Sequence, residues 1–220
     1  MQRCPEPELM NDRQQVLAYA AADFSAGDGR MIQWLQQRLL RRAPLPEAAT
    51  LIDLGCGPGN ISLRLAQHFP GARVIGVDGA QAMVTVARER AAAAGLTVEF
   101  HCCDLRQLEL DSADLVLSNS LLHHLHDPAL LWQATRRLAG PGCRVLHRDL
   151  RRPSGPADID LLQQRHLPDA PPVLLHDFRA SLAAAFEVHE VQQQLHQAGL
   201  DQLTVQEEDD RYLVVSGLVN

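Results

Sequence analysis

One stretch of ten residues, 51–60, constrains the fold of this chain more than any other segment. Its first four residues are apolar apart from Asp53 and have the length of a buried strand. Gly55, Gly57 and Gly59 follow at alternating positions, and an apolar-periodic helix begins at Ile61. A strand that leads through a glycine turn into a helix brings backbone close to a nucleotide-like ligand, because a Cβ would collide with that ligand. The segment therefore predicts an α/β fold with a nucleotide-like ligand at this turn.

The spacing of the glycines shows whether the turn fits a dinucleotide cofactor. A dinucleotide fingerprint reads G-x-G-x-x-G/A, and counting from Gly55 puts Asn60 at its last place. The chain instead reads G-x-G-x-G, with Asp53 two residues before the first glycine. This spacing disfavours a nicotinamide oxidoreductase.

Three further apolar runs each end in a polar residue, at Asp78, Asp104 and Asn119. Asp78 lies about 20 residues after the glycine loop, where an α/β nucleotide site places a carboxylate that accepts the ribose hydroxyls. Ligands of open α/β sheets sit beyond the carboxyl ends of the strands. We therefore expect these polar residues to face one ligand.

Together these segments resemble the class I S-adenosylmethionine (SAM) methyltransferases. The G-x-G-x-G loop with Asp53 resembles the first motif of that family. Residues 121–128, with the paired His123 and His124, resemble the fourth motif of its small-molecule methyltransferases. The resemblance covers residues 51–150 and implies SAM as the cofactor and methyl transfer as the activity.

The resemblance also implies a role for each motif residue. The glycines let backbone approach the methionine part of SAM, and Asp53 orders that loop. Asp78 binds the ribose, Asp104 with Leu105 reads the adenine, and the Asn119 carbonyl faces the methionine end. The expected cofactor-binding residues are Asp53, Gly55, Cys56, Gly57, Gly59, Asp78, Gly79, Met83, Asp104, Leu105 and Asn119.

The alternation of strand and helix patterns predicts a Rossmann-like, doubly wound α/β sheet in a single domain. Helices are expected over residues 11–24 and 30–42. Two β-rich runs near the C-terminus are joined by so short a connection that they must be antiparallel, so the last strand should run against an otherwise parallel sheet. The expected parts are N-terminal helices (1–46), a SAM-binding core (47–150), a helical substrate lid (151–186) and a helix with closing strands (187–220).

Composition narrows the partners and the compartment. The net charge of −7 argues against tight non-specific binding to nucleic acid. No apolar run approaches the roughly 18 residues of a membrane span, and the first residues show no secretory signal. Five cysteines without C-x-x-C spacing are typical of free thiols in a reducing cytosol. We therefore expect a cytoplasmic protein without a membrane contact, whose oligomeric state the sequence leaves open.

Two clusters of side chains have competing interpretations. His124 is the candidate catalytic residue, as a base or a substrate contact, against a structural role in its loop. His123, His124 and His126 resemble metal ligands by count, but no carboxylate pair accompanies them, so no metal is expected. Arg148 and its neighbours Arg151 and Arg152 could hold an anionic substrate or form a solvated basic edge.

The preferred function is methyl transfer to a small-molecule acceptor on oxygen, nitrogen or carbon. One alternative is an RNA- or protein-modifying methyltransferase, which the acidic balance and the sequence 118–121 after the fourth strand disfavour. The other is a SAM-binding module without transfer activity, which the intact glycine loop disfavours. The sequence does not identify the acceptor.

Overall fold

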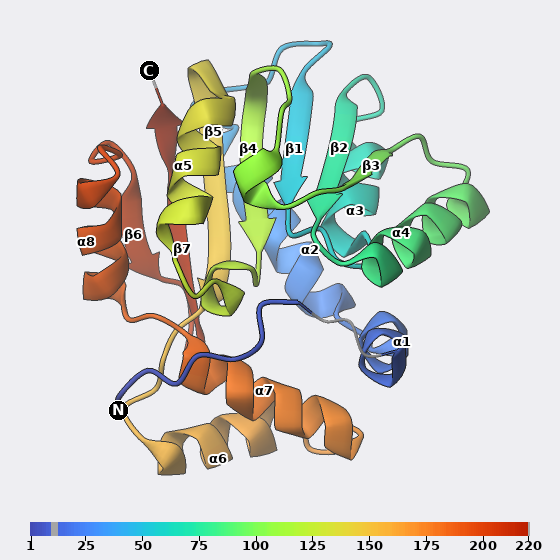
Figure 1. The fold of residues 1–220 in the computed structure, drawn as a ribbon. Helices are drawn as coiled ribbons and strands as arrows, with labels where there is room; N and C mark the ends of the chain where they lie inside the picture. Colours follow the sequence, from blue (N-terminus) through green and yellow to red (C-terminus); the bar gives the residue numbers. More distant parts are fainter. Residues whose placement is uncertain (10–12, 220) are drawn as a thin grey trace.

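The computed structural model describes residues 1–9 and 13–219, and a seven-stranded sheet forms its centre (Figure 1). The strands are β1 (Thr50–Leu54), β2 (Arg73–Asp78), β3 (Glu99–Cys102), β4 (Ala113–Asn119), β5 (Ala139–Leu150), β6 (Thr204–Glu207) and β7 (Tyr212–Val219). Their order is β3-β2-β1-β4-β5-β7-β6. The strands from β3 to β5 pair in parallel, and β7 runs antiparallel to both β5 and β6. This confirms the expected Rossmann-like sheet with an antiparallel closing strand.

The strand order reverses between β1 and β4. From β1 the chain continues outward to β2 and β3 on one side, and from β4 it continues to β5 on the other. In open α/β sheets the ligand sits beyond the carboxyl ends of the strands at such a switch point. The connectivity therefore fixes where a ligand site is expected before any side chain is considered.

Helices cover both faces of the sheet and divide the core in two. On one face Trp132 of α5 packs in the same cluster as Ile52 of β1, and on the other Ile61 of α3 packs with Leu51. Leu51 and Ile52 are adjacent in β1 and so point to opposite faces, as successive residues of a strand do. The helical elements around the sheet are α2 (Ser25–Trp34), the π-helical turn η1 (Leu35–Leu39), α3 (Asn60–His68), α4 (Gln81–Ala94), α5 (Ala129–Leu138) and α8 (Val188–Gln197), with the 3₁₀ turns η2 (Leu105–Gln107) and η3 (Leu122–His124).

The other segments gather at the carboxyl edge of the parallel strands (Figure 1). They are the N-terminal segment (residues 1–9), α1 (Arg13–Ala21), α6 (Pro156–His166) and α7 (Pro172–Ala184). Ile159 of α6 and Leu182 of α7 share a small apolar cluster with Leu150 at the end of β5. The N-terminal segment runs along α7, where the Cys4 N–H donates to the Ala183 carbonyl at 2.9 Å. No helix of the described chain is both long and apolar enough to cross a membrane.

Several elements differ in length from the sequence expectation. The first helix is expected to begin at residue 11, which lies outside the described residues. In the described part of the chain this helix ends at Ala21, and not at residue 24 as expected. α2 begins at Ser25 instead of residue 30, because two glycines in its first turns obscure its apolar period. α7 begins at Pro172, since proline is tolerated in the first turn of a helix. β5 begins at Ala139, whereas the sequence pattern predicts a strand from about residue 144 after a turn at 140–142. That turn is instead a bulge inside the strand, where its pairing with β4 shifts register.

Candidate active site

A cavity of about 210 Å³ opens at the carboxyl ends of β1, β2 and β4, and we refer to it as the switch-point cavity. It lies where the reversed strand order predicts a ligand. Gly59 is the one expected cofactor residue that does not line it. The expected residues that do line it are Asp53, Gly55, Cys56, Gly57, Asp78, Gly79, Met83, Asp104, Leu105 and Asn119.

The three glycines of the loop after β1 all have positive φ but do different work. Their φ angles are 66° at Gly55, 52° at Gly57 and 84° at Gly59. A Cβ on Gly55 would lie 2.6 Å from Leu121 Cδ1, so this glycine permits close packing. Gly59 caps α3, away from the cavity. A Cβ on Gly57 would meet no described atom within 4 Å, so the open side of this glycine is available to a ligand.

Asp78, at the end of β2, holds this loop in place. Its Oδ2 accepts from the Gly57 N–H and its Oδ1 from the Ala80 N–H, both at 2.8 Å. Burial raises the pKa of this carboxyl above its ordinary value, although both backbone N–H groups lower it. Each carboxylate oxygen has two lone pairs, so both can accept a further hydrogen bond from a diol.

Asp53 lies inside β1 and is 1 % exposed. Its Oδ2 accepts from Ser62 Oγ of α3 at 2.6 Å. Burial raises the pKa of Asp53 to about 7; the Ser62 hydrogen bond opposes this rise, and the nearby charge of Asp78 adds to it. The cavity thus contains a carboxyl group whose charge is sensitive to its surroundings.

Two further walls come from the loops after β3 and β4. Asp104 is partly exposed and caps η2, with its carboxylate accepting from the Arg106 N–H at 2.7 Å. Ser120, directly after Asn119, has φ 57°, the one positive φ among the described non-glycine residues. Non-glycine residues in this region are strained, and such strain clusters at functional sites. The sequence analysis did not identify Ser120, because backbone conformation there has no side-chain signature.

A second cavity, of about 840 Å³, lies between the carboxyl edge of the sheet and helices α1, α6 and α7, and we refer to it as the lid cavity. Four residues line both cavities: Tyr19, Asn119, Ser120 and His124. The two spaces therefore adjoin at the loop after β4. Tyr19 was also missed by the sequence analysis, since nothing in the pattern of α1 predicts which residue reaches this loop.

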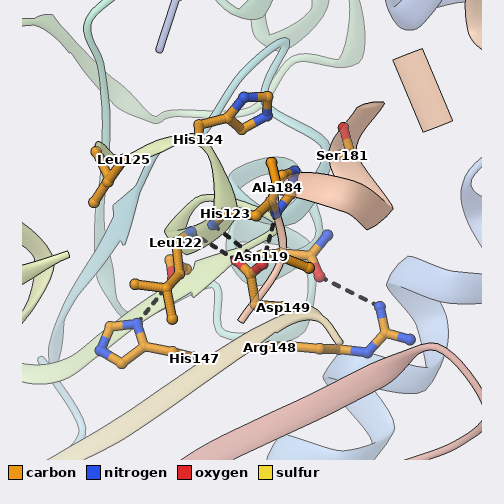
Figure 2. A network of polar contacts seen from close by, with 12 residues as sticks. Asn119, Leu122, His123, His124, Leu125, His147, Arg148, Asp149, Ser181 and Ala184 are labelled. Atoms are coloured by element: carbon orange, nitrogen blue, oxygen red, sulfur yellow. Dashed lines mark hydrogen bonds and ion pairs between the residues drawn. The ribbon is translucent and has the colours of Figure 1, made fainter. Parts of the chain in front are cut away.

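Arg148 of β5 is the most enclosed cation of the lid cavity, with 1 % of its surface exposed. Its Nε donates to Glu208 at 2.5 Å, its Nη1 contacts Asn119 Oδ1 at 3.4 Å (Figure 2), and its guanidinium lies 3.4 Å from the Tyr212 ring centroid. Its buried Nη2 has no hydrogen-bond partner in the described part of the chain, and the same holds for Nε of Arg211. Both arginines line the cavity, and the unsatisfied donor atom of each is itself buried.

The three expected arginines do not act together. Arg151 and Arg152 do not line the lid cavity. Arg152 donates to Glu187 and Glu190, both at 2.9 Å, and so ties the end of β5 to the start of α8. Of these three arginines, only Arg148 can therefore serve the anion-binding interpretation. Arg152 is buried and Arg151 lies 3.4 Å from Glu207, so the two do not form the alternative solvated edge.

The paired histidines of η3 have different surroundings. His123 is buried, and its Nδ1 lies 2.6 Å from Asp149 Oδ1; Asp149 also accepts the Leu122 N–H at 2.7 Å (Figure 2). Burial alone would lower the pKa of His123, but the Asp149 carboxylate outweighs it and the pKa is raised. Burial, reinforced by the charge of His123, lowers the pKa of His124 to about 3. His124 reaches both cavities, whereas His123 reaches only the lid cavity.

The N-terminal segment adds residues that no sequence motif indicated. Glu8 and Leu9 line the switch-point cavity. Arg3 donates to the carbonyls of Ala184, His123 and Leu125, at 2.6, 3.1 and 3.0 Å. The segment is thus fastened to both α7 and η3. It lies more than 100 residues from these partners in sequence, which is why a reading of local patterns missed it.

Comparison with known proteins agrees with this geometry. Residues 51–142 match a protein family described as a methyltransferase domain. The matched region contains the glycine loop, Asp78, Asp104 and Asn119. Over these residues the chain carries a methyltransferase domain.

Relatives of this methyltransferase domain are similar over part of their length. A trans-aconitate 2-methyltransferase of Variovorax paradoxus is 43 % identical over 93 residues, which cover 41 % of this chain and 34 % of the relative. A second protein of that name, from Methylobacterium nodulans, is 35 % identical over 129 residues, covering 53 % and 48 %. The matches thus span about a third to a half of these relatives, and no more than about half of this chain.

Solved structures share the fold of the methyltransferase domain. A SAM-dependent methyltransferase from Aquifex aeolicus superposes with a TM-score of 0.62 at 19 % identity, covering 88 % of this chain and 98 % of that one. The plantazolicin methyltransferase BpumL, solved with S-adenosylhomocysteine (SAH), gives 0.66 at 12 % identity, covering 94 % and 86 %. At these identities the likeness extends to the fold alone.

Proposed function

We propose that this chain transfers the methyl group of SAM to a carboxylate oxygen of a small organic acid. The observation that carries the proposal is the adjoining pair of cavities. One is built like a SAM site and the other is large enough for a small metabolite, and they share the loop after β4. Methyl transfer requires this arrangement, because the acceptor oxygen must approach the methyl carbon in line with the departing sulfur.

In the proposed cofactor site, each residue has the role that the family resemblance implies. Asp78 receives the ribose hydroxyls, Asp104 and Leu105 face the adenine, and Gly57 leaves room for the methionine part. The sulfonium then lies near Asn119. The support is that all of these residues line one cavity, with Asp78 fastened to the glycine loop.

An acid is the favoured acceptor for two reasons. Arg148 and Arg211 line the lid cavity, each has one buried N–H donor without a described partner, and guanidinium groups bind carboxylates well. The curated relatives described above are named for the methylation of trans-aconitate, a carboxylic acid. The match to those relatives leaves about half of this chain uncovered, so the particular acid is open.

The reaction needs little from the protein beyond position and exclusion of water. A carboxylate is already ionised at neutral pH, so no base has to remove a proton. One carboxylate oxygen forms the new C–O bond, the C–S bond breaks, and its electron pair remains on sulfur to give SAH and a methyl ester. His124, the candidate catalytic residue, lies between the two cavities, and we propose that it acts by positioning the acceptor.

The proposed lid comprises α1, α6 and α7, whose residues line the lid cavity. These helices lie at the carboxyl edge of the parallel strands (Figure 1). The function of the lid would be to hold the acid against the loop after β4 and to exclude water, since bulk water would compete for both carboxylate and guanidinium.

The test is product identification. The purified chain is incubated with SAM carrying a labelled methyl group and a panel of mono-, di- and tricarboxylic acids, phenols and amines. We expect label in a methyl ester, which mild base hydrolyses to labelled methanol, whereas a methyl ether or methylamine survives that treatment. Label that resists base would overturn the choice of a carboxylate acceptor. Binding of SAM without any turnover on the panel would favour the SAM-binding module.

A further inference from the structure

Three metal-ligating side chains converge where the N-terminal segment crosses η3. Glu6 Oε1 lies 3.2 Å from His124 Nδ1 and 3.6 Å from His123 Nε2, and the three ligand atoms lie within 4.8 Å of one another. All three groups are largely shielded from water, since Glu6, His123 and His124 side chains are 10 %, 2 % and 15 % exposed. Of these three residues, only His124 lines the switch-point cavity.

The separations fit shared coordination better than direct hydrogen bonding. Zinc lies about 2.0–2.1 Å from histidine nitrogen and carboxylate oxygen, so two tetrahedral ligand atoms are separated by about 3.3–3.5 Å. The two contacts of Glu6 Oε1 fall on either side of that value. His124 Nδ1 is buried and, although a carboxylate lies beside it, makes no hydrogen bond with any described residue. A metal ion between His124 Nδ1 and the Glu6 carboxylate would be coordinated by both groups.

The surroundings orient the ligands in the way that metal sites require. His123 Nδ1 is hydrogen-bonded to Asp149 at 2.6 Å, so in the neutral ring Nε2 carries the lone pair, on the other side of the ring. Metal-ligating histidines almost always have such a carboxylate or carbonyl partner on the second nitrogen. Glu6 Oε1 is held in turn by Ser181 Oγ of α7 at 3.0 Å. The arrangement is therefore supported from β5 and from α7 together.

We propose that Glu6, His123 and His124 bind one divalent transition-metal ion of the zinc class. Two histidines and one glutamate form a ligand set that leaves a fourth position open in tetrahedral geometry. Both histidines line the lid cavity, so the open position can be reached by an oxygen of the acceptor. The ion would also fasten the N-terminal segment to η3. The sequence analysis expected no metal because no carboxylate pair accompanies the histidine stretch. Glu6 supplies a carboxylate from 117 positions upstream of His123.

The test uses the whole chain without an affinity tag, stripped with a chelator and then titrated with Co²⁺ and Zn²⁺. We expect one ion per chain, with visible d–d absorption of Co²⁺ that Zn²⁺ displaces. Glu6→Gln and His124→Asn should each weaken binding at least about tenfold, since even outer-shell changes cost that much. His189→Gln, on exposed α8 and outside the cluster, is the matched control and should bind as the wild type does.

Two results would overturn the proposal: no Co²⁺ binding by the wild type, or equal affinity in wild type, Glu6→Gln and His124→Asn. A thiolate charge-transfer band would equally reject it, because it would place the ion on a cysteine. Glu6 lies outside the sheet, so the Glu6→Gln variant is expected to stay folded, which thermal unfolding monitors. The measurement does not depend on turnover, so its failure would leave the proposed methyl transfer untouched.

Discussion

The switch-point cavity and the lid cavity share four residues, yet the chain builds them in opposite ways. The first is made largely by the loops that follow β1 to β4, so most of its wall comes from short, continuous stretches of sequence. The second draws on β4, β5 and β7, on helices α1, α6 and α7, and on the start of α2. Arg148 and Arg211, two of the arginines that line it, are more than 60 positions apart. A cavity of the first kind can be conserved as a set of motifs, whereas one of the second kind can change its ligand through single distant residues.

If this contrast is correct, changes in one cavity should leave the ligand of the other largely unaffected. The loop after β4 is the exception, because it faces both. Four variants test this separation, and they follow in order of expected effect.

The largest effect should come from Asp53, whose buried carboxyl belongs to the switch-point cavity. Its pKa of about 7 in the folded protein lies above the value of about 3.9 in an unfolded chain, so the folded state binds more protons between these values. The free energy of unfolding should therefore fall as pH rises through this range and level off above it. Between pH 5 and pH 8 the wild type should lose on the order of 3 kcal/mol that Asp53→Asn retains. Urea denaturation of both proteins at the two pH values measures the difference, and parallel pH profiles would contradict the assignment.

Asp78→Asn should weaken SAM binding by about 2 kcal/mol, roughly thirtyfold, because a charged acceptor of the ribose hydroxyls is lost. Some stability should also be lost, since the same carboxylate accepts the Gly57 and Ala80 N–H groups. Calorimetry with SAH gives the affinity. Asp177→Asn, an acid of the lid cavity, is the control and should leave this affinity unchanged. An equal loss of SAH affinity in the two variants would show that the two cavities do not bind their ligands independently.

Arg211→Gln should raise the KM for the acid by about tenfold, or 1.4 kcal/mol, while the affinity for SAH stays as in the wild type. Arg211 lines the lid cavity and not the switch-point cavity, so its loss should remove a contact to the acceptor and not to the cofactor. Arg179→Gln is the matched control, because Arg179 pairs with Asp160 and does not line the cavity. An equal change of KM in both variants would show that the acid is attracted by positive charge anywhere on the protein surface, and not by this site.

The smallest expected effect separates two consequences of replacing a glycine. Backbone strain lowers stability, whereas lost space in the cavity weakens cofactor binding. Gly57→Ala and Gly95→Ala both put a Cβ where φ is positive, at 52° and 63°, and neither Cβ meets a described atom within 4 Å. Both should cost about 1 kcal/mol of stability. Only Gly57→Ala should also weaken SAH binding, by about 1 kcal/mol, because Gly95 ends α4 outside the cavity. Equal SAH affinity in the two variants would show that Gly57 does not face the cofactor.

The same contrast explains how much of the molecule the sequence predicts. Strand and helix periods predict the sheet and its closing antiparallel strand, and the family resemblance between Asp53 and Asn119 predicts ten residues of one cavity wall. Gly59 was assigned to that wall because the motif does not distinguish a glycine that contacts a ligand from one that caps a helix.

The lid cavity could not be predicted in the same way. Tyr19 and Arg211 reach it only because α1 and the segment before β7 are placed there by tertiary packing, and Glu6 reaches His124 at its edge for the same reason. Ser120 is visible only as a backbone angle. None of these residues belongs to a sequence motif that indicates a ligand or a reaction.

The central claim is that a cofactor in the switch-point cavity presents its sulfur to the lid cavity. A crystal structure with SAH and a bound di- or tricarboxylate tests it most directly. The account predicts the ribose hydroxyls on Asp78, the adenine beside Leu105, and the sulfur at the shared loop near Asn119 and Ser120. A carboxylate should lie between that sulfur and Arg148. SAH bound elsewhere, or bound with its sulfur directed away from the lid cavity, would contradict the account.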